Sequence, residues 1–419
     1  MGRFINGECL EQMKKIPDGC IDFIFTSPPY ADQIKDYGST GVKIAPSKFA
    51  DWFLPRAKEM FRILKNDGSF VLDINDKVDG RYQSTFVFKL VIMMTEEVGF
   101  HLVRDYIWYN PATPPNVFSR GNLGRTKKSH EYCFWFSKSN KWTFHMDAIR
   151  KPYSASMQSL LKSLPHGDRT VNTRPSRHNF DLSHPWKDKG GADPGSVIEI
   201  SNTSSNDMFH RLCKQFGVSH PARFPIKLAE FFIKAGTNEG DVVLDPFAGS
   251  GTTAIAAKKL GRDFLYIEIN PDYWKMAKKW YNVKFHGNTI YKINMRKFEH
   301  DVIPVCRWNL LPYSYLYDLF YAWLPKVGLY EIPQTRKAFR ERINAWFVNN
   351  PDWIITNHYQ TVTKENMPLP EPLIVKYDLK NWKNGCDSKN KEEICSPKLG
   401  LRYMGIMRRG TQTETEGIE

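Results

Sequence analysis

The fold is decided by the stretch Val243-Leu244-Asp245-Pro246-Phe247-Ala248-Gly249-Ser250-Gly251-Thr252-Thr253, in a chain of 419 residues. Apolar residues predict a short buried strand over 241–244 and a helix over 254–260. A strand, a glycine turn and a helix together present backbone N–H groups and a helix N-terminus to a ligand. Gly249 and Gly251 permit backbone conformations that a side chain would disfavour. The stretch therefore predicts a ligand-binding turn at the edge of a parallel sheet.

The turn lacks the signatures of phosphate-binding loops. A P-loop needs a lysine before its final Ser/Thr, but Gly251 precedes Thr252, and the third glycine of the dinucleotide pattern is absent. Glu268 ends the apolar run 264–267, where a carboxylate at the end of a second strand can accept both hydroxyls of a ribose. These features predict a nucleoside-like cofactor and give no indication of a bound pyrophosphate.

A second motif, Thr26-Ser27-Pro28-Pro29-Tyr30, follows the apolar strand predicted over 21–25. Each proline fixes its φ angle and lacks an N–H, so the turn is stiff and its carbonyls point outward. Because the carboxyl ends of parallel strands lie at one edge of a sheet, we expect this motif beside the glycine turn. A plain rigid loop is the alternative.

Together the two motifs resemble those of the S-adenosylmethionine-dependent methyltransferases that modify exocyclic amines of DNA bases. Residues 27–30 look like the catalytic motif of this family, and 245–253 look like its cofactor motif. The catalytic motif comes first, which is the permuted beta order, and the resemblance covers residues 4–285. It implies a Rossmann-like α/β fold with a mostly parallel sheet flanked by helices.

The resemblance also implies roles for individual residues. Ser27 Oγ and the Pro28 carbonyl would accept hydrogen bonds from the amine, on a turn stiffened by Pro29, and Tyr30 would stack on a base rotated out of the duplex. Catalysis would rest on positioning, and no metal is required. The implied cofactor-binding residues are Glu8, Phe224, Asp245, Phe247, Gly249, Ser250, Gly251, Thr252 and Glu268.

The target base is predicted from the first residue of the catalytic motif. In the resembled family Ser is commoner in cytosine-N4 enzymes, whereas Asp or Asn is commoner in adenine-N6 enzymes, so Ser27 favours cytosine and adenine is the alternative. Chemistry at cytosine carbon 5 uses a Pro-Cys pair, and none of the seven cysteines follows a proline. Protein or RNA methyltransferases, with Asn-Pro-Pro-Tyr and the opposite motif order, fit less well. A catalytically inactive DNA-binding protein is a further alternative.

The net charge of +14 and the pI of about 9.3 favour a polyanionic partner such as DNA, although a generally basic surface would give the same values. Residues 150–190 hold eight basic and three acidic side chains in a loop-rich composition. In the resembled family a target-recognition region lies there, although a basic insertion is an alternative. The predicted DNA contacts are Arg120, Arg169, Arg174, Arg177 and Lys187.

We predict four segments: a catalytic half over 1–149, a target-recognition insertion over 150–196, a cofactor-binding half over 197–290, and a C-terminal α+β accessory domain over 295–419. The last is winged-helix-like, or alternatively a plain scaffold or a dimerisation domain, with an expected strand over 373–377. The sequence has no apolar run of roughly 18 or more residues and no signal peptide, and its unpaired cysteine spacing is typical of reduced thiols. We expect no membrane contact, and a cytoplasmic protein of a bacterium, archaeon or phage. Its oligomeric state is not predicted.

Overall fold

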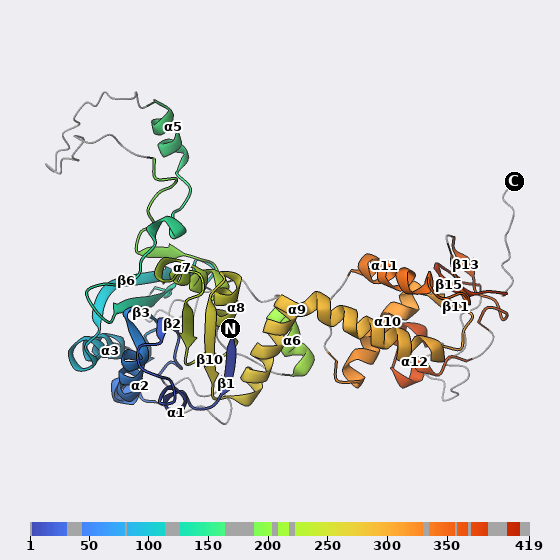
Figure 1. The fold of residues 1–419 in the computed structure, drawn as a ribbon, viewed down its shortest axis with the longest axis horizontal. Coiled ribbons are helices and arrows are strands. Elements are labelled where there is room, and N and C mark those ends of the chain that lie inside the picture. The colour runs from blue at the N-terminus through green and yellow to red at the C-terminus, as the bar shows by residue number, and fades with distance from the viewer. Residues whose placement is uncertain are drawn as a thin grey trace. The chain divides into compact units, whose positions relative to one another are not determined.

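The computed structural model describes the chain over a set of ranges that Figure 1 traces from blue to red. These are residues 2–31, 44–79, 82–113, 126–163, 188–202, 208–217, 223–329, 335–356, 358–367, 370–383 and 400–410. The chain divides into two compact units, Met1–Tyr281 and Asn282–Glu419. The boundary between them falls within helix α9 (Pro271–Asp301).

The first unit is built on an eight-stranded sheet with the order β1-β10-β9-β2-β3-β7-β6-β8. The strands from β1 to β3 in this order are parallel, and β7 runs antiparallel to both β3 and β6. This architecture confirms the predicted mostly parallel α/β sheet. The strands are β1 (Arg3–Asn6), β2 (Ile21–Thr26), β3 (Leu64–Ile74), β6 (His101–Tyr109), β7 (His130–Ser137), β8 (Val197–Glu199), β9 (Val242–Asp245) and β10 (Asp263–Glu268).

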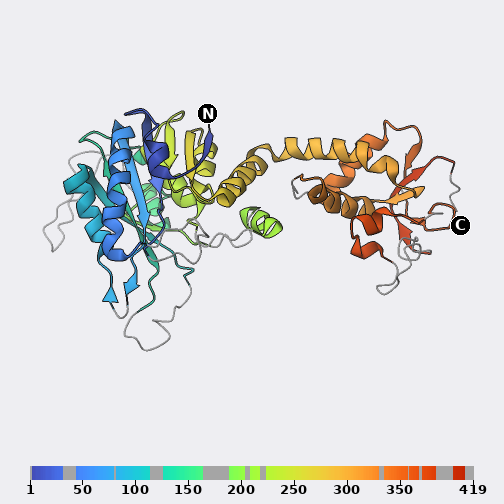
Figure 2. The same cartoon turned by 90° about the horizontal axis from the view of Figure 1, so that it is seen from below.

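Helices cover both faces of this sheet (Figures 1 and 2). Successive side chains of a strand point to opposite faces. Thus Ile24 packs into a core with α1 (Cys9–Met13), α2 (Phe49–Ile63) and α3 (Phe86–Met93). Phe23 and Phe25 pack into the opposite core with α7 (Ile226–Gly236) and α8 (Thr252–Lys259). The two apolar faces explain why the central strands read as nearly continuous apolar runs.

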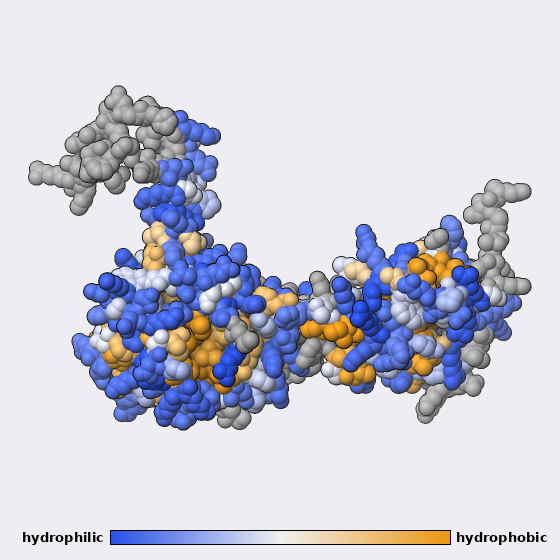
Figure 3. All heavy atoms as spheres, in the orientation of Figure 1, coloured by the Kyte–Doolittle hydropathy of each residue, from blue (hydrophilic) through white to orange (hydrophobic). Residues whose placement is uncertain are grey.

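Shorter elements complete the first unit. A hairpin joins β4 (Val78–Asp79) to β5 (Tyr82–Gln83). The remaining helices are η2 (Pro46–Lys48), the π-helical turn η3 (Met94–Val98), η4 (Met146–Ile149), α5 (Ala155–Ser163) and α6 (Met208–Phe216). On the face drawn in Figure 3, this unit is mostly hydrophilic, with apolar side chains gathered near its centre.

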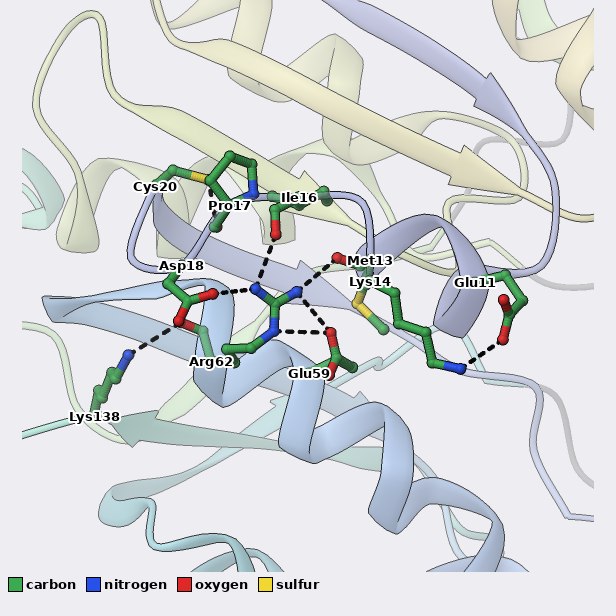
Figure 4. Close-up of polar contacts among 10 residues, drawn as sticks. All are labelled: Glu11, Met13, Lys14, Ile16, Pro17, Asp18, Cys20, Glu59, Arg62 and Lys138. Atoms are coloured by element: carbon green, nitrogen blue, oxygen red, sulfur yellow. Dashed lines mark hydrogen bonds and ion pairs between the residues drawn. The ribbon is translucent and has the colours of Figure 1, made fainter.

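Arg62 at the end of α2 fastens α1 in place (Figure 4). Its guanidinium donates to the Met13 carbonyl at 3.0 Å and to the Ile16 carbonyl at 2.9 Å, at the C-terminal end of α1. The carboxylates of Glu59 and Asp18 accept from the same group. The Met13 carbonyl also accepts the Ile16 N–H at 2.9 Å, so Arg62 adds a second donor there and ties the end of α1 to α2.

The second unit combines helices with a three-stranded antiparallel sheet of order β11-β15-β12 and a two-stranded pair, β13-β14. Its core includes Trp308, Tyr315 and Phe320. Its elements are η5 (Ile303–Val305), β11 (Leu310–Pro312), α10 (Tyr313–Lys326), α11 (Arg336–Phe347), β12 (Trp353–Ile355), β13 (Gln360–Thr361), α12 (Leu373–Lys376), η6 (Lys380–Trp382), β14 (Arg402–Tyr403) and β15 (Gly405–Arg408).

The prediction of a strand over 373–377 is wrong, because Leu373–Lys376 forms the short helix α12. The Glu371 carboxylate accepts the Leu373 N–H at 3.2 Å and thereby satisfies one of the free donors of the first helical turn. Ile374 and Val375 therefore lie in a helix although both residue types have high β propensity. Across the described ranges, no helix combines the length and the hydrophobicity needed to cross a membrane.

Candidate active site

The two sequence motifs meet at one edge of the large sheet. Strands β2 and β9 are parallel neighbours, so Thr26 and Asp245 end side by side although 219 residues separate them. Thr26 Oγ1 donates to Asp245 Oδ1 at 2.6 Å, and Thr253 Oγ1 donates to Asp245 Oδ2 at 2.6 Å. The Phe247 N–H also donates to this carboxylate, at 3.2 Å. Asp245 therefore joins the Pro-Pro turn to the glycine turn.

Asp245 contacts both turns but does not line the cavity. Its side chain is buried, and burial raises its pKa to about 6 against the opposing hydrogen bonds of Thr253, Thr26 and the Phe247 N–H. The cavity at this edge, of about 380 Å³, is not lined by Asp245, Gly251, Thr252 or Pro28. The structure thus gives Asp245 contacts that hold the two turns, and its predicted contact with a cofactor stays a prediction.

Most of the predicted catalytic and cofactor-binding residues line the cavity together. Its volume lies within the usual range for small-molecule sites. The predicted residues on its wall are Glu8, Ser27, Pro29, Tyr30, Phe224, Phe247, Gly249, Ser250 and Glu268. The residues that the sequence analysis did not assign to the site include Trp52, Arg56, Asp73, Glu131, Asn202 and Arg223.

The glycine turn forms one end of the cavity. Gly249 has φ of +46° and donates its N–H to Glu268 Oε2 at 2.8 Å, while the Asn270 N–H donates to Oε1 at 2.8 Å. Burial raises the pKa of Glu268 to about 7, against these two hydrogen bonds. Gly251 has φ of +84°, and a Cβ there would lie 3.0 Å from the Ala277 Cβ. The turn is close-packed behind and open to the cavity in front.

A carboxylate and an aromatic pair form the neighbouring wall. Glu8 Oε2 accepts the Glu11 N–H at 3.0 Å at the start of α1, and Arg56 Nη2 donates to Glu8 Oε1 at 2.8 Å. Burial opposes ionisation of Glu8, but these two contacts outweigh it and lower its pKa. The Arg56 guanidinium also lies 4.2 Å from the Trp52 ring centre, and the rings of Trp52 and Phe247 are 5.7 Å apart. An ionised carboxylate beside aromatic rings suits an adenine with its amine.

The Pro-Pro turn forms the other end. Ser27 Oγ donates to the Tyr30 hydroxyl at 3.2 Å, and that hydroxyl donates to Glu131 Oε2 at 2.5 Å. Burial raises the pKa of Glu131, against the Tyr30 hydrogen bond and the charge of Lys128. Burial and the nearby Glu131 charge raise the pKa of Asp73 well above its usual range. Two carboxyl groups and two hydroxyls are therefore concentrated in a poorly solvated corner.

The carboxyl groups of Asp73 and Glu131 lie on strands that run in opposite directions. Asp73 lies near the end of β3, at the edge where the parallel strands finish. Glu131 lies at the start of β7, which is antiparallel to β3 and so begins where β3 ends. An acidic residue next to an apolar strand was the available sequence signal for both, in Phe70–Ile74 and Cys133–Phe136.

The predicted DNA contacts Arg120, Arg169, Arg174, Arg177 and Lys187 lie outside the described residues. Most of the predicted recognition insertion, 164–187, lies outside them too. Among the residues that are described, no group of three or more His, Cys, Asp or Glu is arranged to hold a metal ion.

Comparisons with known proteins give concordant matches. Residues 21–279 match the family model described as DNA methylase, for N6 and N4 methyltransferases. The chain is 37% identical over 282 residues to the type II methyltransferase M.PvuII of Proteus hauseri, covering 65% of this chain and 81% of the relative. It is 28% identical over 310 residues to M.HpaI of Haemophilus parainfluenzae, covering 73% and 82%.

A solved structure agrees with these sequence matches. The PvuII DNA methyltransferase, described as cytosine-N4-specific, superposes with a TM-score of 0.51 at 30% identity. The match covers 65% of this chain and 83% of the solved one. The family match over residues 21–279 lies within the first compact unit, which contains both motifs.

Proposed function

The chain belongs to the DNA methylase family of N6 and N4 methyltransferases, and from this premise we propose that it methylates the N4 amine of cytosine in DNA with S-adenosylmethionine as donor. The observation that carries the proposal is that Ser27 and Gly249 line one cavity although they come from motifs at opposite ends of the first unit. One turn would hold the donor and the other would hold the base.

The cavity wall suits the proposed cofactor. Glu268 would accept the ribose hydroxyls, Trp52 and Phe247 would flank the adenine, and Glu8 would accept from its amine. Phe224 closes the wall beside the Pro-Pro turn, where its ring centre lies 5.0 Å from that of Phe25. When bound, S-adenosylmethionine supplies an electrophilic methyl group on a cationic sulfur, which a wall of carboxylates stabilises.

The Pro-Pro turn suits an exocyclic amine. Such an amine is a poor nucleophile because its lone pair is conjugated with the ring. Ser27 Oγ and the Pro28 carbonyl would accept its two hydrogens and favour a tetrahedral nitrogen, while Tyr30 would support the rotated base. Holding both reactants in line contributes on the order of 7–11 kcal/mol to the lowering of a barrier.

Two observations support cytosine over adenine. The catalytic motif begins with Ser27, and the relative with a solved structure is described as cytosine-N4-specific. DNA contact by Arg120, Arg169, Arg174, Arg177 and Lys187 remains part of the proposal, as do the predicted boundaries at 149/150 and 196/197 and the winged-helix-like character of 295–419. Since the relatives named above come from bacteria, we also propose that the chain acts in the cytoplasm, where its DNA substrate lies.

The direct test is incubation of the chain with mixed-sequence duplex DNA and methyl-labelled cofactor, followed by nucleoside mass spectrometry. We expect labelled N4-methylcytosine. The Ser27→Ala variant is the control and should lose most transfer while its cofactor affinity, measured by calorimetry, is retained. Labelled N6-methyladenine would establish the alternative base, and cofactor binding without any product would favour an inactive DNA-binding protein.

A further inference from the structure

Three groups at the Pro-Pro turn form a hydrogen-bond chain with a defined direction. Ser27 Oγ donates to the Tyr30 oxygen at 3.2 Å, and Tyr30 Oη donates to Glu131 Oε2 at 2.5 Å. A hydroxyl has one hydrogen to donate and two lone pairs to accept with. Because Ser27 donates its one hydroxyl hydrogen to Tyr30, its oxygen lone pairs can accept a hydrogen bond from a group in the cavity.

The direction of this chain is determined by its last member. An ionised carboxylate can only accept hydrogen bonds, so Glu131 requires the Tyr30 hydrogen to point toward it. The Tyr30 oxygen is then left as an acceptor for Ser27. Without the carboxylate, both hydroxyls could rotate, and Ser27 Oγ could present its hydrogen to the substrate amine, which would meet a donor where it needs an acceptor.

We propose that Glu131 is a positioning residue that acts through Tyr30: it orients Ser27 Oγ as an acceptor for the substrate amine and receives the proton which the methylated amine releases. This inference deepens the proposed function and rests on it. It concerns a residue on β7, 101 positions from Tyr30 along the chain.

The proton that the amine releases can pass along Ser27, Tyr30 and Glu131. As the new N–C bond forms, the S–C bond of the donor breaks and its electron pair stays on sulfur, so the amine nitrogen gains the positive charge. The nitrogen then loses one proton to Ser27 Oγ, Ser27 passes its own proton to Tyr30, and Tyr30 passes its own to Glu131. The carboxylate becomes a carboxylic acid, which returns the proton to solvent after product leaves.

The surroundings of Glu131 suit a group that takes up a proton. The titratable and charged groups near it are Tyr30, Asp73, Asp76 and Lys128. Lys128 and Asp76 form an ion pair at 2.5 Å and largely offset each other. Burial raises the pKa of Glu131, so an added proton on its carboxylate is less unfavourable than it is in water.

The test compares Glu131→Gln, Tyr30→Phe and the double variant with the wild-type chain, by kcat, KM and cofactor affinity on duplex DNA. Each single variant should lower kcat by about 100-fold, the scale of one general base, with KM and calorimetric cofactor affinity unchanged. The double variant should be no slower than the slower single variant, because both changes interrupt one chain. The fall of kcat at low pH in the wild type should disappear in Glu131→Gln.

A readout that does not depend on turnover is the ¹⁹F NMR signal of 3-fluorotyrosine placed at position 30. Its resonance should shift when Glu131 becomes Gln in the protein without cofactor or DNA.

Tyr313→Phe is the control for the kinetic comparison. It removes a 2.5 Å hydrogen bond to Asn344 in the second unit and should change neither kcat nor the pH profile.

The outcomes separate the inference from the proposed function. A wild-type chain that modifies no base in DNA contradicts the proposed function itself. An active wild type whose Glu131→Gln variant keeps its kcat and pH profile overturns the inference alone. Loss of kcat together with raised KM and a lowered unfolding temperature would also overturn it, because that pattern indicates a structural role for Glu131.

Discussion

Glu268 is a cavity side chain whose charge we expect to affect the binding of a cationic ligand. Its carboxylate is buried, accepts the N–H groups of Gly249 and Asn270, and has a pKa that burial raises to about 7. Below pH 7 the group is largely protonated in the free protein. Above pH 7 it is ionised, and in that form it would accept both ribose hydroxyls and attract a sulfonium under the proposed function.

The affinity for S-adenosylmethionine should therefore rise with pH through about 7 and level off above it, by at most about tenfold per pH unit for one linked proton. The sign follows because ligand binding favours the ionised form. Calorimetry in buffers from pH 5.5 to about 8.5 measures this dependence. In Glu268→Gln the affinity should be weaker and nearly independent of pH across that range. An equally steep dependence in the variant would contradict this role.

Some cavity residues could be predicted from local sequence motifs, whereas Glu131 could not. Ser27, Tyr30, Gly249 and Glu268 were predicted because each belongs to a local motif, and all four line the cavity. Glu131 was not predicted, because its importance depends on a partner 101 positions away. No local pattern carries the information that these two side chains meet.

The glycine turn between β9 and α8 is the element on which we expect cofactor binding to depend. Gly249 has a left-handed φ of +46° and its N–H holds the Glu268 carboxylate. A β-branched residue is strongly disfavoured there, because Cβ approaches the following carbonyl. The turn would have to change conformation, and its N–H would no longer point at Glu268.

Gly249→Val should weaken cofactor affinity by at least about tenfold, which corresponds to 1.4 kcal/mol, a cost within the range of left-handed strain. Gly195→Val is the matched control, since no atom lies within 4 Å of the Cβ position there. Calorimetry with both variants measures the difference. Equal affinities would mean that the conformation of the turn is not needed for binding.

The directions of the strands explain which parts of the cavity edge could be predicted from the sequence. The strands expected over 21–25, 241–244 and 264–267 are buried on both faces, so they were visible as apolar runs, and parallel pairing aligns their ends. Strand β7 runs the other way, so its beginning, with Glu131, reaches the same edge. Which strand pairs with which, and in which direction, depends on contacts distant in sequence.

For the chain as a whole, the comparisons confirm the predicted family and the structure confirms the predicted fold of the first unit. The second unit was less predictable. Its α10 helix lies in an aromatic-rich run without a clear polar face, and the strand expected over 373–377 is the short helix α12. At α12 the surrounding structure outweighs the β propensity of Ile374 and Val375.

The central claim is that two distant turns form one site, with the donor at Gly249 and Glu268 and the amine at Ser27 and Tyr30. The most direct measurement is a crystal structure of the full chain with S-adenosylhomocysteine bound. We predict ribose hydroxyls at the Glu268 carboxylate, the adenine beside Trp52 and Phe247, and the sulfur facing Ser27. Ligand density elsewhere, or a sulfur directed away from the Pro-Pro turn, would contradict the account.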